Sequence, residues 1–486
     1  MTADVATSAD LEHTSAGAGN AAAQTPADLL ADLRYGFNGE IVTPADPEYD
    51  GYRRHFNRRF DKHPALVLRP ANTVDVVAAV RYARAADLEI AVSCGGTHPA
   101  GFSRTDGGVV VDLSLMRAVK VEPMEQTAWL QGGALGGDLY AEAGRHGLGG
   151  VMGWMRTTGV GGVNVHGGWG PLSPKLGWGV DTILEMEIVT ADGEVLRLAP
   201  NENSELFWGA RGAGGNFGIV TWVKQKLCRV PEKALIGTLM YTPEQGPDVL
   251  RLVDELVMTA SEDMSMFVYS SVVPDEPAYP EALRGRHGFM VVVVHIGDRD
   301  QAVEELRPLR EAYPPALDGV VERSLYDFTC EMDSFIVPCR QWYDFVEVEA
   351  LTDDVIEAVT TSAQRMEELE LTAELTLVAV GRGRDPEHPS ALAVGNRPGA
   401  WLMMPDTFWE DEADDEKNIG WADEFMTTLS TCESHSDIGY GNVQSRPDVD
   451  RERRSFGEET WQRLVALKRQ YDPENLFHLN HNIPPA

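Results

Sequence analysis

The sequence predicts a two-lobed α+β protein, and three observations support that prediction. Strand-like and helix-like segments alternate through the first half, three glycine-dense stretches interrupt that half, and from about Pro231 apolar strand runs and amphipathic helices follow with few glycines. Strands with separate helices are typical of an antiparallel sheet that carries its helices on one face. At 486 residues the chain also exceeds the size at which one hydrophobic core stops growing, so we expect more than one domain.

The first elements form a strand, a helix and a strand. Residues 65–68 (ALVL) are an apolar run stopped by Pro70, and residues 90–92 (IAV) are a second such run. Between them Thr73 is a suitable N-cap for a helix, because its hydroxyl can accept a free N–H group of the first turn. The apolar residues of this helix recur at three- and four-residue steps: Val76, Val77, Val80 and Ala83. Units of this kind support a ligand-binding sheet.

The loop at 93–103 (SCGGTHPAGFS) connects the second strand to a third apolar run at 109–111. Paired glycines there let the backbone approach a ligand closely, and successive free N–H groups form a concavity suited to a phosphate. A pyrophosphate cradle is one interpretation of this loop, and a tight turn is the other.

Two further glycine-dense stretches follow, at 149–170 (GGVMGWMRTTGVGGVNVHGGWG) and at 205–220 (ELFWGARGAGGNFGIV). Each glycine in an ordered element costs roughly 0.5–1 kcal/mol relative to alanine, so this density indicates that something requires bare backbone there. None of the three clusters has the strand, GxGxxG and helix context, with an acidic residue about 20 positions later, that a nicotinamide-binding Rossmann fold needs. The sequence therefore disfavours that fold.

The second half is expected to supply the antiparallel sheet and its helices. Two strands and two helices are predicted, at 267–273, 289–294, 302–313 and 353–369. We expect the polar, turn-rich loop at 379–396 to border a pocket. The acidic run at 410–416 is interpreted as a solvated surface or the start of a helix, because closely spaced carboxylates repel one another.

Composition and charge exclude several partners. The formal net charge of -35 repels phosphates, so nucleic acid and anionic lipid surfaces are not expected to bind. The five cysteines, an odd number without a CxxC pair, fit a reducing compartment, and we expect a cytoplasmic protein. Residues 1–27 contain no Lys or Arg and no signal-length apolar run, so we interpret them as a disordered leader. No stretch approaches the ~20 apolar residues of a membrane span, and no metal site is predicted.

Eight stretches, taken together and in order, resemble those of a known family. They are HPALVLRP (63–70), GGTHPAGFS (95–103), DGGVVVDLS (106–114), TTGVGG (157–162), LSPKLG (172–177), VTADGEV (189–195), ELFWGARGAGGNFGIVT (205–221) and YDPENLFHLNHNIPP (471–485). They are similar to the vanillyl-alcohol oxidase or PCMH superfamily, and most closely to its berberine-bridge-enzyme-like branch. The resemblance implies a PCMH-type FAD-binding domain split between 28–232 and 439–486. It also implies a substrate domain at 233–438, built on an antiparallel sheet covered by helices.

The resemblance implies FAD as the cofactor. Its pyrophosphate would lie on the backbone of 93–98, where bare N–H donors satisfy phosphate oxygens without a positive side chain. Asn480 and Asn482 would line the ribityl or ring side, although an asparagine near a chain end is equally a turn residue. The implied binding residues are Ser93, Cys94, Gly95, Gly96, Thr97, His98, Thr158, Gly159, Gly161, Gly162, Gly214, Asn216, Gly218, Ile219, Val220, Asn480 and Asn482.

Two departures from the family pattern concern how FAD is attached. Many relatives attach FAD through the histidine of a GGH motif, but this chain has Thr97 at that position and His98 one residue later. Covalent attachment is therefore either absent or made by His98 after a one-residue slip. Doubly linked relatives use a cysteine before the TTGVGG stretch, where this chain has Met155, and a thioether cannot lose a proton to attack the flavin. Cys94 is alternatively a small buried core residue.

Candidate catalytic residues lie in two places. Tyr440 and Asn442 stand in GYGN (439–442), where relatives carry a YxN strand that returns to the flavin domain; a phenol there can act as a base or orient a donor alcohol. A buried tyrosine with a satisfied hydroxyl is the alternative. His166 could reach the flavin or a substrate, or serve as a structural hydrogen-bonding group. Three tryptophans form either an aromatic wall or core: Trp154, Trp169 and Trp178.

The resemblance implies an FAD-dependent oxidoreductase, with O₂ as the expected acceptor and a small molecule, such as a natural product, as substrate. The flavin would take hydride from a carbon that bears OH or NH, while a base such as Tyr440 takes the heteroatom proton. Two alternatives stay open. The enzyme could couple oxidation to ring closure or desaturation in secondary metabolism, or the protein could bind flavin without catalysing a reaction.

Overall fold

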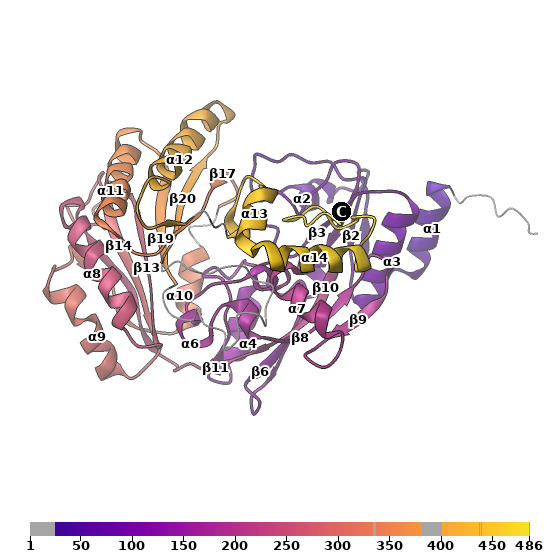
Figure 1. Ribbon diagram of the computed structural model, residues 1–486, viewed down its shortest axis with the longest axis horizontal. Coiled ribbons are helices and arrows are strands. Elements are labelled where there is room, and N and C mark those ends of the chain that lie inside the picture. Colours follow the sequence, from indigo (N-terminus) through magenta and orange to yellow (C-terminus); the bar gives the residue numbers. More distant parts are fainter. Residues whose placement is uncertain (1–24, 334–336, 381–400, 437, 439, 486) are drawn as a thin grey trace, which may run out of the picture.

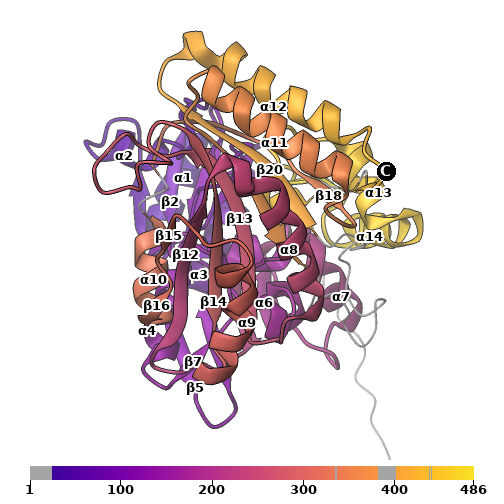
Figure 2. The same ribbon diagram turned by 90° about the vertical axis from the view of Figure 1, so that its left-hand side faces the viewer.

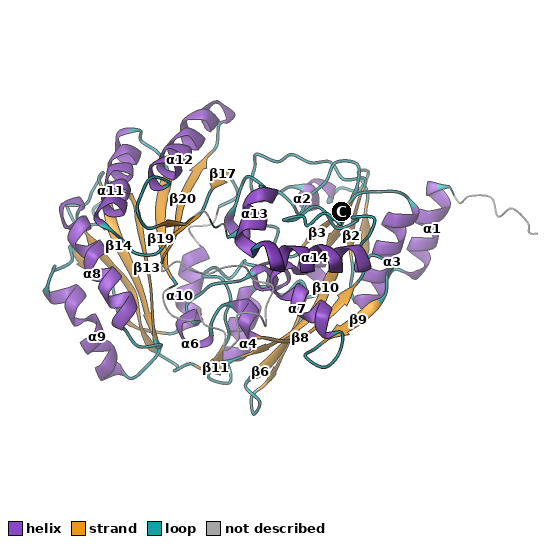
Figure 3. Ribbon diagram, in the orientation of Figure 1, coloured by secondary structure: helices purple, strands orange, loops and turns teal. Residues whose placement is uncertain are grey.

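The computed structural model describes residues 25–333, 337–380, 401–436, 438 and 440–485. Two lobes of mixed helix and strand lie side by side, which confirms the predicted fold class (Figures 1 and 3). Most of the predicted leader (1–24) and most of the predicted pocket-bordering loop (381–396) lie outside the described residues. Residues 26 and 27, which the leader prediction included, instead begin helix α1 (Pro26–Gly36), because the Thr25 hydroxyl accepts the Asp28 N–H at 3.2 Å and caps it.

A four-stranded sheet forms one side of the first lobe, in the order β1-β2-β4-β3. Its strands are β1 (Glu40–Val42), β2 (Leu66–Arg69), β3 (Ile90–Ser93) and β4 (Val109–Asp112), and β2 and β3 both run parallel to β4. Helix α3 (Thr73–Ala85) connects β2 to β3 as predicted. Its N-cap is Asn72 rather than Thr73, since the Asn72 side chain accepts the Asp75 N–H at 3.1 Å. The short helix α2 (Tyr49–Arg53) precedes β2.

A five-stranded antiparallel sheet forms the other side of the first lobe, in the order β5-β6-β10-β8-β9. Its strands are β5 (Val119–Glu122), β6 (Thr127–Gln131), β8 (Ile183–Val189), β9 (Val195–Leu198) and β10 (Ile219–Lys226). The short strands β7 (Leu148–Gly149) and β11 (Cys228–Arg229) pair beside it. The helices of this part are α4 (Gly136–Gly144), α5 (Val160–Val163), α6 (Ser173–Leu176) and α7 (Ser204–Ala213). The glycine-dense stretches at 149–170 and 205–220 thus connect the strands of this sheet.

A ten-stranded sheet forms the second lobe, and every strand pairing in it is antiparallel. Its strands are β12 (Ala234–Tyr241), β13 (Met264–Val272), β14 (His287–His295), β15 (Leu317–Asp318), β16 (Val321–Arg323), β17 (Arg340–Tyr343), β18 (Val346–Val348), β19 (Ala373–Ala379), β20 (Trp401–Trp409) and β21 (His435–Ser436). Helices α8 (Gly246–Thr259), α9 (Arg299–Glu311), α11 (Asp353–Glu368) and α12 (Asp415–Leu429) cover the face turned away from the first lobe (Figure 2). Helix α10 (Leu325–Met332) lies on the opposite side, toward α4 (Figure 1).

The C-terminal segment returns to the first lobe through α13 (Val449–Phe456) and α14 (Glu458–Tyr471) (Figure 1). Lys468, fully buried, holds this segment in place. Its ammonium group pairs with Asp472 at 2.7 Å and donates at 2.8 Å to the carbonyls of Asn216 and Phe477. Removing one partner of a buried ion pair is strongly destabilising, so this contact fixes the C-terminal segment against the third glycine-dense stretch. Among the described residues, no helix is both long enough and apolar enough to span a bilayer.

Candidate active site

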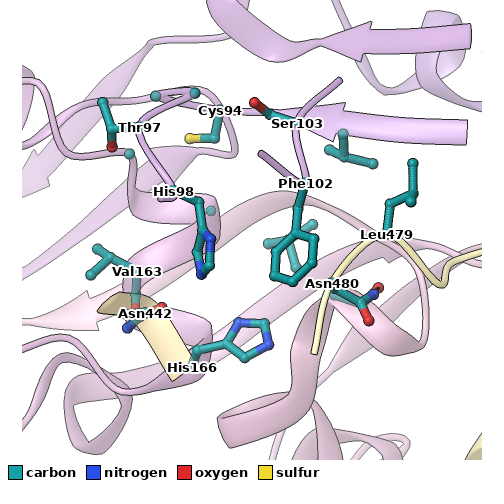
Figure 4. A pocket seen from close by; sticks show the side chains of 18 of the residues that line it. Cys94, Thr97, His98, Phe102, Ser103, Val163, His166, Asn442, Leu479 and Asn480 are labelled. Atoms are coloured by element: carbon teal, nitrogen blue, oxygen red, sulfur yellow. Dashed lines mark hydrogen bonds between the residues drawn. The ribbon is translucent and has the colours of Figure 1, made fainter. Parts of the chain in front are cut away.

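A first cavity lies in the first lobe between its two sheets, and Figure 4 shows the side chains around it. Three separate parts of the chain line it: the loop after β3, the stretch around α5, and the C-terminal segment. The described lining residues are Ile90, Val92, Cys94, Gly95, Gly96, Thr97, His98, Phe102, Ser103, Leu113, Thr158, Gly159, Gly161, Gly162, Val163, His166, Gly215, Val220, Asn442, Phe477, Leu479, Asn480 and His481. The sequence therefore brings together residues almost 400 positions apart.

Close packing of the backbone requires glycine at several positions of this wall. A Cβ atom on Gly161 would lie 2.4 Å from the carbonyl oxygen of Gly132, and one on Gly95 would lie 2.7 Å from that of Thr157. Gly96 has a φ of +68°, a conformation that L side chains rarely adopt. By contrast, a Cβ on Gly162 would meet nothing within 4 Å. The loops therefore contact one another through backbone, and Gly162 faces open space along the cavity.

Several buried polar atoms at this cavity have no hydrogen-bond partner among the described residues. They include Ser103 Oγ, His166 Nε2 and Asn480 Oδ1. A buried polar atom without a partner costs about 1–3 kcal/mol, so unpaired groups of this kind indicate a ligand with complementary donors and acceptors. FAD, with its phosphates, ribityl hydroxyls and pyrimidine edge, fits such a wall of glycine backbone and mixed polar atoms.

The structure places the predicted binding residues in two groups. Those that line the first cavity are Cys94, Gly95, Gly96, Thr97, His98, Thr158, Gly159, Gly161, Gly162, Val220 and Asn480. Those outside the lining are Ser93, Gly214, Asn216, Gly218, Ile219 and Asn482. Asn216 anchors the C-terminal segment instead, because its Oδ1 accepts the Ile483 N–H at 2.9 Å and its Nδ2 donates to the His481 carbonyl at 3.2 Å.

Cys94 is held as a neutral thiol. Its Sγ donates to the Gly132 carbonyl at 2.8 Å, and burial raises its pKa to about 11. The thiolate is the reactive form of cysteine, so this residue supports the cavity wall rather than reacting with a ligand.

Both ring nitrogens of His98 are engaged. Its Nε2 donates to the Gly441 carbonyl at 2.9 Å, and its Nδ1 accepts the Ala100 N–H at 3.2 Å. Burial and the neighbouring His481 hold the pKa of His98 well below its usual value. His98 is therefore a neutral imidazole whose two nitrogens already have partners, and its ring lies 4.7 Å from that of Phe102.

His481, in contrast to the neutral His98, has surroundings that favour its protonated form, and the sequence analysis did not identify it. Its Nε2 lies 2.6 Å from the Gly441 carbonyl, which only accepts, and its Nδ1 lies 2.8 Å from a Glu452 carboxylate oxygen. Burial alone would lower the pKa of His481, but Glu452 outweighs burial and raises it. The resulting imidazolium lies at the wall of the first cavity, beside His166. Burial and this charge lower the pKa of His166 to about 4, so His166 is neutral.

A second cavity, of about 280 Å³, lies where the first lobe meets the ten-stranded sheet. It shares Thr97, Thr158, Val163 and Asn442 with the first cavity, so the two cavities adjoin. Its described lining residues are Phe56, Thr97, Pro99, Gly153, Trp154, Met155, Thr158, Val163, Trp169, Phe267, Tyr269, Met332, Tyr343, Glu374, Thr376, Val378, Leu402, Met404, Asp406, Phe408, Tyr440, Asn442 and Val443. Of the three tryptophans, Trp154 and Trp169 form part of this wall, whereas buried Trp178 stacks edge-on against Tyr440.

Alternation along the strands of the large sheet produces the outer wall of this second cavity. On β19, Glu374, Thr376 and Val378 face the cavity, while Leu375 and Leu377 belong to the apolar core beneath helices α8, α9, α11 and α12. Successive side chains of a strand point to opposite faces, so one strand serves both the core and the cavity. The same pattern places Leu402, Met404, Asp406 and Phe408 of β20 on the cavity side.

Two acids face each other across β19 and β20. Glu374 and Asp406 are directly paired in the strand register, and Tyr343 of β17 is paired with Asp406 on its other side. Thr376 donates to Asp406 Oδ2 at 2.9 Å, while Oδ1 has no partner among the described residues, although Asp406 is only 6% exposed. Burial, and then repulsion from Glu374, raise the pKa of Asp406 well above its usual value; burial raises that of Glu374 to about 7.

Sequence reasoning missed this acid pair, and one signal could have found it. The segment AELTLVA (373–379) alternates Glu, Thr and Val with leucine and alanine, which is typical of a strand with one face turned from the core. A glutamate on that face is either solvated or part of a site. The pairing with Asp406 depends on strand register, which the sequence does not show.

Tyr440 and Asn442 lie at the junction of the two cavities. The Tyr440 phenol oxygen accepts the Gly168 N–H and the Asn442 amide, each at 2.8 Å, and the Asn442 amide also donates to the Val163 carbonyl at 3.0 Å. The structure thus brings the predicted Tyr440 and Asn442 together, whereas the third catalytic candidate, His166, lines only the first cavity.

Replacing Glu374 by glutamine is expected to stabilise the protein at pH 8 and to have little effect near pH 5. The pKa of Glu374, about 7, exceeds the ordinary 4.5, so the folded chain binds this proton more tightly than the unfolded chain. The stability gained from this proton is complete below about pH 4.5. It is lost as the pH rises through 7, which lowers the free energy of unfolding by about 3 kcal/mol. Glutamine stays neutral at every pH and therefore avoids this loss of stability. Thermal unfolding midpoints from pH 5 to pH 9 measure the difference.

Glu410→Gln is the matched control for this prediction, because Glu410 lies just after β20 and is exposed. Its midpoint should follow that of the unmodified protein at every pH. A Glu374→Gln midpoint shift that is the same at pH 5 and pH 8 would contradict the assigned titration.

Comparison with known proteins agrees with this geometry. A family model described as an FAD binding domain matches residues 64–199, and one described as berberine and berberine like matches residues 419–484. The chain is 30% identical over 455 residues to (R)-6-hydroxynicotine oxidase of Paenarthrobacter nicotinovorans, covering 92% of this chain and 97% of that protein. It is 26% identical to an FAD-linked oxidoreductase of Dictyostelium discoideum, covering 89% and 92% of the two chains.

Solved structures show the same similarity. The crystal structure of 6-hydroxy-D-nicotine oxidase from Arthrobacter nicotinovorans superposes with a TM-score of 0.84 at 28% identity, covering 93% of this chain and 98% of that one. Xylooligosaccharide oxidase from Myceliophthora thermophila shares the fold, with a TM-score of 0.81 at 20% identity, covering 95% and 99%. FAD as cofactor and an oxidoreductase activity follow from these matches. The chain belongs to the berberine-bridge-like family of FAD-dependent oxidoreductases.

Proposed function

We propose that this enzyme oxidises a small molecule, held in the second cavity, at a carbon that bears OH or NH, with O₂ as the final acceptor. The adjacency of the two cavities carries this proposal, because four residues, Thr97, Thr158, Val163 and Asn442, line both. FAD held by the residues of the first cavity would supply the hydride acceptor for the substrate carbon. That several relatives are named oxidases supports O₂ as acceptor.

We assign proton transfer to the acid pair. A base works best when its pKa lies near the working pH, and the raised pKa values of Glu374 and Asp406 bring them toward that range. The two carboxyls titrate as a coupled pair, so one proton shared between them leaves one negative charge available. In this proposal the pair accepts the N–H or O–H proton of the substrate. Tyr440, held by two N–H donors, orients the substrate instead of acting as the base.

We further propose that FAD is bound without a covalent bond. Thr97 stands where relatives of the GGH type have their attachment residue, and a threonine hydroxyl does not form the histidyl bond. His98 offers no free ring nitrogen, since Gly441 and Ala100 engage both. Attachment through His98 would require both contacts to be broken. His481, positively charged at the cavity wall, would instead stabilise negative charge on a bound flavin.

Three finer assignments accompany this proposal. Domain boundaries are placed at 28–232, 233–438 and 439–486, because the large sheet begins with β12 at Ala234 and the chain returns to the first lobe after β21. A cytoplasmic location is supported by the five cysteines, none of which forms a disulfide. A role in secondary metabolism is supported by the aromatic and aliphatic side chains of the second cavity, which suit a ring-containing natural product.

Purified protein tests the proposal in two steps. It is expected to be yellow, to bleach without oxygen when a substrate from a panel of amines and alcohols is added, and to recover its colour in air. Acid precipitation should then release the flavin into the supernatant. If the yellow colour returned slowly in air but quickly on adding a quinone, the acceptor would be a quinone rather than O₂. Flavin retained in the pellet, and lost from it in His98→Ala, would show a covalent bond to His98.

A further inference from the structure

We propose that the second cavity selects a cation: an amine that is protonated in solution and attached to an aromatic or other apolar ring system. The inference deepens the proposed function and rests on it, because it names the substrate class of the same site. Its basis is the set of groups that face the cavity. Among the described lining residues the only side chains that ionise to full charges at neutral pH are the carboxyls of Glu374 and Asp406, with no Lys, Arg or His among them.

The position of Asp406 calls for a donor from outside the protein. One carboxyl oxygen, Oδ2, is held by the Thr376 hydroxyl at 2.9 Å, and the other, Oδ1, is buried without a partner in the described part of the chain. A buried carboxyl that lacks a partner is costly, and two carboxyls on paired strand positions add repulsion to that cost. An ammonium N–H donor supplies both the missing hydrogen bond and the missing positive charge.

Aromatic rings form a further part of the wall. The Trp154 ring lies 5.2 Å from that of Trp169 and 4.6 Å from that of Phe267, and Phe267 is stacked on Tyr269 at 6.0 Å. Ring faces attract cations, and they also bury apolar rings of a ligand. The neutral hydrogen-bonding groups of the described wall are hydroxyls, one amide and two indole N–H groups, from Thr97, Thr158, Thr376, Tyr269, Tyr343, Tyr440, Asn442, Trp154 and Trp169. Among the described lining residues, an anion would meet only the negative charge of Glu374 and Asp406.

The cation also explains how the acid pair can ionise. Among the described residues that line this cavity, every other titratable group is a phenol: Tyr343 beside Asp406, Tyr269 on β13, and Tyr440 at the junction. None of these supplies positive charge, so the pair without ligand retains a proton at neutral pH. A bound ammonium group favours the carboxylate form, since an opposite charge nearby lowers a carboxyl pKa. Proton transfer from that ammonium to the carboxylate then gives the neutral amine, whose lone pair is needed for hydride loss.

Binding of unreactive ligands to the FAD-loaded enzyme tests this inference. Benzyltrimethylammonium has no N–H and no nitrogen lone pair, so it cannot be oxidised as an amine. Its isostere benzyldimethylamine N-oxide has no net charge, and phenylacetate is an anion. The flavin difference spectrum and the shift in thermal unfolding midpoint report binding. We expect the cation to bind at least about tenfold more tightly than the N-oxide, and phenylacetate not to bind.

The double variant Glu374→Gln and Asp406→Asn is expected to lose about tenfold or more in affinity for the cation, with little change for the N-oxide. Glu410→Gln, outside the cavity, should bind like the unmodified enzyme. Equal binding of cation and N-oxide by the unmodified enzyme overturns the inference even if the double variant does not fold. So does an unchanged cation affinity in a folded double variant. Because these ligands are not oxidised, absence of turnover would sink the proposed function and leave this result standing.

Discussion

Replacing Gly162 by leucine is expected to give a folded protein that contains no FAD. A Cβ at this position meets nothing within 4 Å, and Gly162 lines the first cavity, so the new side chain projects into the space that the cofactor requires without disturbing the fold. A leucine there would occupy volume that the ligand needs. Flavin absorbance per protein and the midpoint of thermal unfolding measure the two parts of this expectation.

Substitutions at two other glycines serve as controls for this prediction. Gly420 lies within α12, also has nothing within 4 Å, and is far from either cavity, so Gly420→Leu should keep its flavin. Gly161→Ala places a methyl group 2.4 Å from the Gly132 carbonyl, so it should lower the unfolding midpoint as well as the flavin content. If Gly162→Leu is isolated with a full complement of FAD, the cofactor does not occupy the first cavity.

Sequence reasoning locates the first cavity well because backbone chemistry determines it. A wall built from N–H groups needs glycine at fixed positions, and the clusters at 95–96 and 159–162 show that requirement directly in the sequence. Ser93, by contrast, ends β3 and is buried behind the wall, and Asn216 holds the C-terminal segment. Proximity in sequence to a glycine cluster places a residue near the cavity, yet side-chain direction decides whether it faces the ligand.

Groups that depend on long-range pairing are harder to predict. His481 acquires its charge from Glu452, 29 positions away on a different element, and Glu374 meets Asp406 only because β19 and β20 pair in one register. Neither register nor helix docking is encoded in a local pattern. The alternation of β19 shows that Glu374 leaves the core face, but the identity of its partner requires the folded sheet.

The acid pair is a stability cost that a purely structural role does not explain. Buried carboxyls without a cationic partner are retained at the expense of folding free energy, and mutual repulsion adds to this. Strained or destabilising groups of this kind cluster at functional sites, because the chemistry needs them. Glutamine or asparagine would fit the same strands with less penalty. The pair is therefore explained by what it does to a ligand.

Replacing Asp406 by asparagine is expected to lower kcat/KM by about 10²- to 10⁴-fold while FAD stays bound. A base that accepts the substrate proton contributes an effect of this size, and an amide cannot take a proton. Asp406 is favoured over Glu374 for this test because its Oδ1 lacks a partner in the described structure and lies at the second cavity. The rate of anaerobic flavin bleaching at several substrate concentrations separates the chemical step from binding.

Thr376→Val is the matched control, since it removes the hydrogen bond to Oδ2 and keeps the acid. It should change kcat/KM far less than Asp406→Asn, and its main effect should be on the pH dependence. The hydroxyl donates to the carboxylate form and so lowers the pKa of Asp406, which means that its loss raises that pKa. The alkaline rise in bleaching rate should therefore move to higher pH in Thr376→Val. An Asp406→Asn enzyme that bleaches within threefold of the unmodified rate would assign the proton to another group, and Glu374, its partner across the strands, is then the residue to replace.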